Sequence, residues 1–150
     1  MADVSLKTRL QTEMREALRS GDKVRLGALR MLSAGITNRE KELRHELSDD
    51  EVRDVAAREV KRRSESIEAF AKGGRQDLVD KETAERDVLA AYAPERLSEA
   101  EVDALVEEAI AETGATSMRE MGKVMGAVMA RGKGRVEGNV VQAKVRQRLA

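Results

Sequence analysis

Apolar residues recur every three or four positions along most of the chain, which is the spacing of one face of an α-helix. The first such stretch begins after Ser5, a residue type that caps helices, and ends at Gly21. The second runs from Asp22 to about Arg44. Because its first half is apolar on more than one side, we expect this helix to be central and buried. Its apolar residues are Val24, Leu26, Ala28, Leu29, Met31, Leu32, Ala34 and Ile36.

The sequence Ser-x-x-Glu occurs at Ser48, Ser98 and Ser117, and each occurrence predicts the start of a helix. In such a capping box the serine side chain accepts a hydrogen bond from the third backbone N–H, and the glutamate reaches back to the serine N–H. The helix after Ser48 is expected to end at Gly73-Gly74. Another helix is expected from about Asp77 to Tyr92.

Ala93-Pro94 interrupts this pattern, because proline lacks the N–H that a helix interior needs and disfavours helix in the preceding residue. We place a domain boundary there. The predicted fold is all-α, with an N-terminal bundle of about four helices in residues 1–93. A small three-helix tail module follows in residues 94–150, and its last helix comes after Gly138.

Composition supports the helical prediction and excludes several chemistries. Charged residues make up 37% of the chain and aromatic residues 1%, a mixture that argues against an all-β protein. The absence of cysteine excludes a disulfide, a thiolate zinc site and a cysteine nucleophile. His45 is the single histidine, and in its polar surroundings we expect it to have no special role. We therefore predict no catalytic set, no metal site and no cofactor.

No apolar run approaches the 18 residues of a membrane-spanning helix. The first residues, Met-Ala-Asp-Val-Ser, also lack the basic and apolar regions of a secretory signal peptide. The expectation is a cytoplasmic protein without a membrane partner.

The net charge is zero, but the last third of the chain is polarised. Residues 95–112 contain seven acids and one base, whereas residues 119–150 contain eight bases and two acids. The glycine-rich loop Arg131–Gly138 lies in the basic part, and it lacks the sequence of a nucleotide-binding P-loop. Its bases and their neighbours could follow an RNA backbone through phosphate contacts. The candidate RNA-binding residues are Arg119, Lys123, Arg131, Lys133, Arg135 and Lys144. The alternative is that these charges only neutralise the acidic helix.

Three other patterns favour a structural interpretation. The basic stretch Arg58–Ser66 could contact phosphate, but it fits a solvated helix face better because acids lie within pairing distance. Methionines at 118, 121, 125 and 129 lie at helical spacing and are expected to be core. Gly122 and Gly126 suggest that a second helix approaches closely there.

Several segments together resemble the GatB/YqeY family over essentially the whole chain. The N-terminal ones are Arg30–Leu32, Glu59–Ser66, Gly74–Leu78 and the hinge Tyr92–Ser98. The most specific one is Glu112–Gly126, with Gly132–Arg135 and Gly138, which is similar to the tail domain shared with GatB, a subunit of the glutamine-dependent tRNA amidotransferase.

The resemblance implies an all-α protein whose tail docks on tRNA or another structured RNA. We expect the protein not to catalyse a reaction itself. Under this hypothesis the N-terminal helices dock a partner protein or fix the geometry. The alternative is a protein-interaction adaptor with no RNA role, which the zero net charge and the acidic residues 95–112 favour. The family label also implies a carbon–nitrogen ligase activity with glutamine as amido donor. This chain lacks the GatB catalytic domain, and no nucleophile or phosphate-donor site stands out in it, so that hypothesis ranks third.

Overall fold

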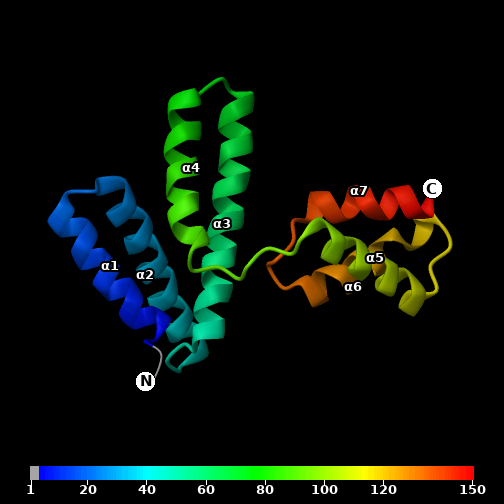
Figure 1. Ribbon diagram of the computed structural model, residues 1–150, viewed down its shortest axis with the longest axis horizontal. Helices are drawn as coiled ribbons and strands as arrows, with labels where there is room; N and C mark the ends of the chain where they lie inside the picture. Colours follow the sequence, from blue (N-terminus) through cyan, green and yellow to red (C-terminus); the bar gives the residue numbers. More distant parts are fainter. Residues whose placement is uncertain (1–3) are drawn as a thin grey trace. The chain divides into compact units, whose positions relative to one another are not determined.

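The computed structural model describes residues 4–150, and every regular element in that range is helical. The all-α prediction is therefore confirmed for the described residues. The chain divides into two compact units, one ending at Pro94 and one from Glu95 to Ala150. Figure 1 shows the first unit in blue to green and the second in yellow-green to red.

The N-terminal unit contains four helices, α1 (Leu6–Ser20), α2 (Lys23–Leu43), α3 (Asp49–Lys72) and α4 (Gln76–Ala90). Their starts follow the sequence signals. Ser5 accepts from Thr8 N–H, Asp22 accepts from Arg25 N–H, and the capping box between Ser48 and Glu51 is complete in both directions.

Helix α2 is central in this unit, as its apolar circumference predicts, and it packs against α1, α3 and α4. Helices α3 and α4 form a long antiparallel hairpin beside it (Figure 1). The fully buried side chains include Leu29 and Leu32 of α2, Val52 of α3 and Leu89 of α4, followed by Tyr92 just after α4. These long-range contacts hold the four helices in one bundle.

The C-terminal unit contains α5 (Glu99–Thr113), a 3-10 turn (Met118–Glu120), α6 (Met121–Gly132) and α7 (Gly138–Leu149). The capping box predicted at Ser98 is present. The one predicted at Ser117 is wrong, since the Ser117 side chain caps nothing. The chain instead enters the 3-10 turn, and the Glu120 carboxylate accepts from Thr116 N–H at 3.0 Å.

The core of this unit is built mainly from valine. Six of its nine buried residues are valines contributed by all three helices, and the others are Ala109, Ala115 and Leu149. Met121, Met125 and Met129 are half-buried and pack against it, so they have the predicted packing role but lie at the margin of the core. Met118 is 40% exposed and does not belong to that core.

The glycines of α6 do not pack as the sequence suggests. A side-chain carbon placed on Gly122 or Gly126 would meet nothing within 4 Å, so the predicted close approach of a second helix is wrong. The close approach occurs instead at Gly132, where such a carbon would lie 2.5 Å from Val136 Cγ1. None of the helices in residues 4–150 combines the length and the apolar character needed to cross a membrane.

Candidate nucleic-acid interface

Three of the six predicted RNA-binding residues are exposed cations of the C-terminal unit. Arg119 lies in the 3-10 turn, Lys123 lies one turn later at the start of α6, and Lys133 caps the end of α6. None of the three side chains forms an ion pair or hydrogen bond with any residue in the range 4–150. Their charges are therefore available to an external anion.

The other three predicted residues are held by partners within the same unit. Arg131 forms ion pairs with Glu108 at 3.2 Å and with Glu112, and the Arg135 Nε donates to the Glu95 carbonyl at 2.7 Å. Lys144 lies 2.7 Å from Asp103 and 3.4 Å from Glu99, and its side chain is only 15% exposed. The structure thus separates the six candidates into an open set (Arg119, Lys123 and Lys133) and a held set (Arg131, Arg135 and Lys144).

Acids of helix α5 hold two of these three residues, Arg131 and Lys144. Asp103 and Glu107 face α7, where they pair with Lys144 and Arg148. The hydrogen bond from Lys144 lowers the pKa of Asp103, and the same bond raises the pKa of Lys144. The alternative interpretation of the sequence, neutralisation within the tail, therefore applies to part of the basic set.

The basic loop is shorter than the sequence suggests, because α6 continues through Arg131 to Gly132. Lys133 adopts the left-handed conformation with φ 38° and ψ 61° at the helix end. That conformation is unfavourable for a residue with a side chain, by about 1–2 kcal/mol, and glycine usually occupies it.

Small residues lie beside the open cations on the exposed side of α6. Gly122, Gly126 and Ala130 are all exposed, and with Lys123 they recur at helical spacing along the same face. This spacing is visible in the sequence, where the glycines suggest internal packing instead. An exposed helix face without side chains lets a partner approach the backbone closely.

The basic stretch in α3 contains a buried ion-pair cluster. Arg63 is 8% exposed, and its Nε lies 3.4 Å from carboxylate oxygens of both Glu82 and Glu85 of α4. Its guanidinium also contacts the sulfur of Met31 in α2. Arg63 is therefore a packing residue of the N-terminal bundle. The prediction of a solvated face fits Lys61 and Arg62 but is wrong for Arg63.

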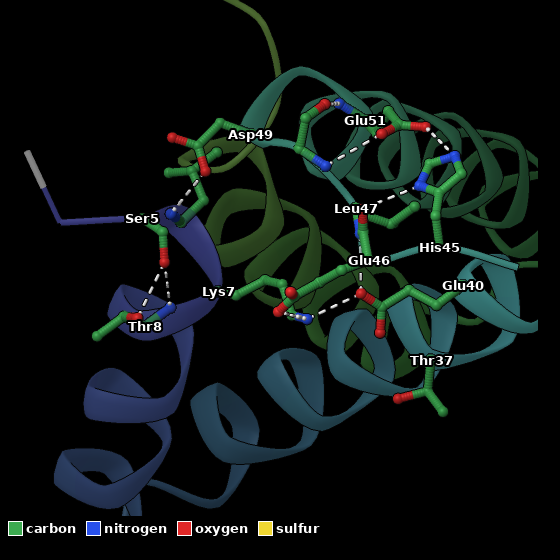
Figure 2. Close-up of polar contacts among 12 residues, drawn as sticks. Ser5, Lys7, Thr8, Thr37, Glu40, His45, Glu46, Leu47, Asp49 and Glu51 are labelled. Carbon is green, nitrogen blue, oxygen red and sulfur yellow. Dashed lines mark hydrogen bonds and ion pairs between the residues drawn. The ribbon is translucent and has the colours of Figure 1, made fainter. Parts of the chain in front are cut away.

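A polar cluster fixes the first turn of α1 against the α2–α3 connection (Figure 2). Lys7 Nζ pairs with Glu40 at 2.8 Å and Glu46 at 3.0 Å, and Asp49 Oδ1 accepts from Leu6 N–H at 3.0 Å. The hydrogen bond to Glu40 raises the pKa of Lys7, and it lowers the pKa of Glu40. Lys7, Glu46 and Asp49 line an open cleft of 490 Å³. Because the polar groups of the cluster pair with one another, we interpret it as a structural clasp.

His45 lies at the edge of the same cluster and is exposed. Its Nε2 is 3.5 Å from Glu51, and its Nδ1 is 2.9 Å from the Glu46 carbonyl oxygen. Within residues 4–150, no three His, Cys, Asp or Glu side chains are grouped so that they could hold a metal ion.

Comparison with known proteins places this sequence in one family. Residues 7–149 match the family described as Yqey-like protein. The chain is 37% identical, over 142 residues, to the Altered inheritance of mitochondria protein 41, mitochondrial, of Pyrenophora tritici-repentis, an alignment that covers 93% of this chain and 78% of the relative. The protein of the same name from Lachancea thermotolerans is 31% identical over 69% of this chain and 57% of the relative.

These relatives correct the expected location and identify the family. Both carry names that assign them to mitochondria, which contradicts the prediction of a cytoplasmic protein. That prediction rested on the lack of a secretory signal and of a membrane span, and neither feature distinguishes the cytoplasm from the interior of an organelle. The family match covers nearly the whole chain, and the chain covers 78% of a relative to which it is 37% identical. These two findings show that this protein belongs to the Yqey-like family.

Proposed function

We propose that the C-terminal unit binds tRNA or another structured RNA through phosphate contacts made by Arg119, Lys123 and Lys133. The observation that carries the proposal is the division of the basic residues. These three are exposed and have no partner within residues 4–150, although acids are abundant in the same unit. Unpaired cations on one helix and on the turns at its two ends are suited to a polyanion.

The conformation of Lys133 supports this proposal. Glycine would be more stable in its left-handed position, and glycines stand on both sides of it in the sequence. The lysine at this position places its charged amine at the end of α6. Strain of this kind is common where a side chain has a functional task.

The small residues beside Lys123 support the proposal as well. Gly122 and Gly126 each weaken an exposed helix by about 1 kcal/mol relative to alanine, and neither has a neighbour that excludes a side chain. The flat face that they create would let an RNA backbone lie against α6, with Lys123 beside it.

The composition of the unit indicates which features of RNA it would recognise. Both aromatic residues of the chain, Phe70 and Tyr92, precede Glu95, so the C-terminal unit has no ring on which an unpaired base could stack. Proteins that read single-stranded bases usually rely on such stacking. The proposed ligand is therefore a folded RNA recognised by its backbone shape.

A salt-dependent titration of purified protein against total tRNA tests the proposal. The double variant Lys123→Glu/Lys133→Glu is expected to weaken binding about tenfold or more at low salt, because each charge reversal replaces an attraction to phosphate by a repulsion. Raising the salt from about 50 to 200 mM should weaken wild-type binding steeply and the variant less.

The matched control is Lys72→Glu/Lys81→Glu, which changes the net charge equally at two exposed lysines of the N-terminal unit. It should bind tRNA nearly as well as the wild type. If both double variants lose the same affinity, the binding follows net charge and the proposed interface is wrong.

A protein-binding adaptor is the second candidate function, and the α3–α4 hairpin favours it. Ile67, Phe70 and Leu78 lie in the half of this hairpin nearest its turn, are only partly buried and do not belong to the core of the N-terminal unit. Recovery of one defined protein by the wild type after nuclease treatment, but not by a Phe70→Ser variant, would support it.

A further inference from the structure

Arg131 has an unusual position among the cations of the C-terminal unit. It lies in the last turn of α6, and it extends its two Nη atoms to separate carboxylates one turn apart on α5, Glu108 and Glu112. These are the only side-chain ion pairs between α5 and α6 that residues 4–150 contain. Two acids on successive turns present two anionic groups to the guanidinium, as two phosphates of a nucleic-acid strand would.

The fold does not depend on this pair. All three side chains are substantially exposed, and exposed ion pairs contribute little to stability and weaken with salt. Helices α5 and α6 are held together by buried valines instead, among them Val106, Val124 and Val128. The carboxylates could therefore be exchanged for another anion without loss of the core.

The other held cations differ in this respect. Lys144 is largely buried between Asp103 and Glu99, and Arg135 donates to a backbone carbonyl that would be left without this partner. Arg131 is the held residue whose partners can be replaced at the smallest cost, and it is two residues from the open cation Lys133.

We propose that Arg131 is a reserve RNA-binding residue and that Glu108 and Glu112 are an internal competitor that occupies it. This inference rests on the proposed function. RNA phosphate competes with the two carboxylates for Arg131, so the acids lower the affinity of the tail for RNA and the average number of phosphates that it contacts. Neutralising the acids releases Arg131 to the RNA.

A double-mutant cycle tests this competition by tRNA titration of the full chain at two salt concentrations. The variants are Glu108→Gln/Glu112→Gln, Arg131→Gln and the combination of all three changes. The glutamine pair is expected to tighten binding several-fold and to steepen the salt dependence by about one phosphate contact. In the Arg131→Gln background the same pair should tighten binding much less, because no cation remains to be released.

The control Glu65→Gln/Glu68→Gln removes two exposed acids from α3, and neither of them forms an ion pair with another of the described residues. The competition would be overturned if this control tightened tRNA binding as much as the glutamine pair does. It would also be overturned if the glutamine pair tightened binding equally in the wild-type and Arg131→Gln backgrounds, because net charge alone would then explain the gain in affinity. If the wild type binds tRNA but the glutamine pair has no effect, the competition fails and the proposed function stands. If wild type and glutamine pair both fail to bind, both proposals fail. Melting temperatures near that of the wild type confirm that the variants are folded.

Discussion

The Tyr92 hydroxyl donates a 2.6 Å hydrogen bond to Glu13 Oε2, a carboxylate 79 residues earlier in the chain. Glu13 also accepts from Arg9 at 2.8 Å and Arg25 at 3.0 Å, and the Arg9 guanidinium lies over the Tyr92 ring. One half-buried carboxylate thus connects α1, α2 and the segment after α4.

This carboxylate should make the N-terminal unit sensitive to acid. Burial alone would raise the pKa of Glu13, but hydrogen bonds from Tyr92 and Arg9 outweigh it, so the pKa lies below its ordinary value of 4.5. The folded state therefore binds the proton less tightly than the unfolded state. The stabilisation is fully present above pH 4.5 and is lost as the pH falls through the folded pKa.

Glu13→Gln is accordingly expected to lower the free energy of unfolding by about 1–3 kcal/mol at neutral pH. The difference from wild type should shrink as the pH falls below 4.5. Urea unfolding followed by tyrosine fluorescence measures the free energy of unfolding of the N-terminal unit, since Tyr92 is the single tyrosine and there is no tryptophan. A difference that does not vary with pH would show that the charge of Glu13 is not what stabilises this contact.

Two adjacent arginines in α3 should respond very differently to truncation. Arg63→Ala leaves Glu82 and Glu85 without their buried cation, which is expected to cost about 3–5 kcal/mol. Arg62→Ala removes an exposed side chain paired with Glu59 at 3.4 Å, and should change stability by less than about 1 kcal/mol. Urea midpoints of the two variants decide the matter. Similar midpoints would mean that the Arg63 cluster is solvated.

The glycines of α6 should also divide into two groups. Gly126→Ala should stabilise the C-terminal unit by up to about 1 kcal/mol, because nothing opposes the new methyl group. Gly132→Ala should destabilise it by about 1–3 kcal/mol, because the methyl group would collide with Val136.

Val136→Ala should rescue part of the Gly132→Ala loss by removing the colliding methyl groups. The measurement is thermal unfolding by circular dichroism, which reports on helices that lack an aromatic probe. If the double variant is as unstable as the sum of the single variants, the collision is not the cause.

Lys133→Gly should move stability and RNA affinity in opposite directions. Glycine relieves the left-handed conformation and should stabilise the unit by about 1 kcal/mol, while the loss of the cation should weaken tRNA binding. Arg44 also has a left-handed conformation, with φ 59° at the end of α2, so Arg44→Gly serves as the control. It should gain stability without any change in tRNA affinity.

Much of the fold could be predicted from the sequence because its signals are local. Ser48 and Ser98 each cap the helix that directly follows, and Gly114 ends α5 in the left-handed conformation that glycine favours. Ser117 has the same local pattern as the other two serines. It fails as a cap because the chain there forms a 3-10 turn, and nothing in the four-residue pattern distinguishes the two outcomes.

The candidate site was harder to predict because it depends on distant partners. Arg63 is buried by acids of α4 that lie some twenty residues further along the chain, and Arg131 and Lys144 are held by acids of α5. Spacing along one helix shows which charges share a face, but not which face meets another helix. The open set of Arg119, Lys123 and Lys133 therefore emerges only from the structure.

The valine core of the C-terminal unit has a consequence for how so small a unit can fold. A β-branched side chain has little rotational freedom about χ1, so it loses less entropy on burial than a longer, unbranched side chain such as methionine. Six buried valines give a unit of this size a core with a low ordering cost, while the flexible methionines remain at its half-exposed margin. The buried side chains thus have little rotamer freedom to lose on folding, whereas the flexible side chains stay near the surface.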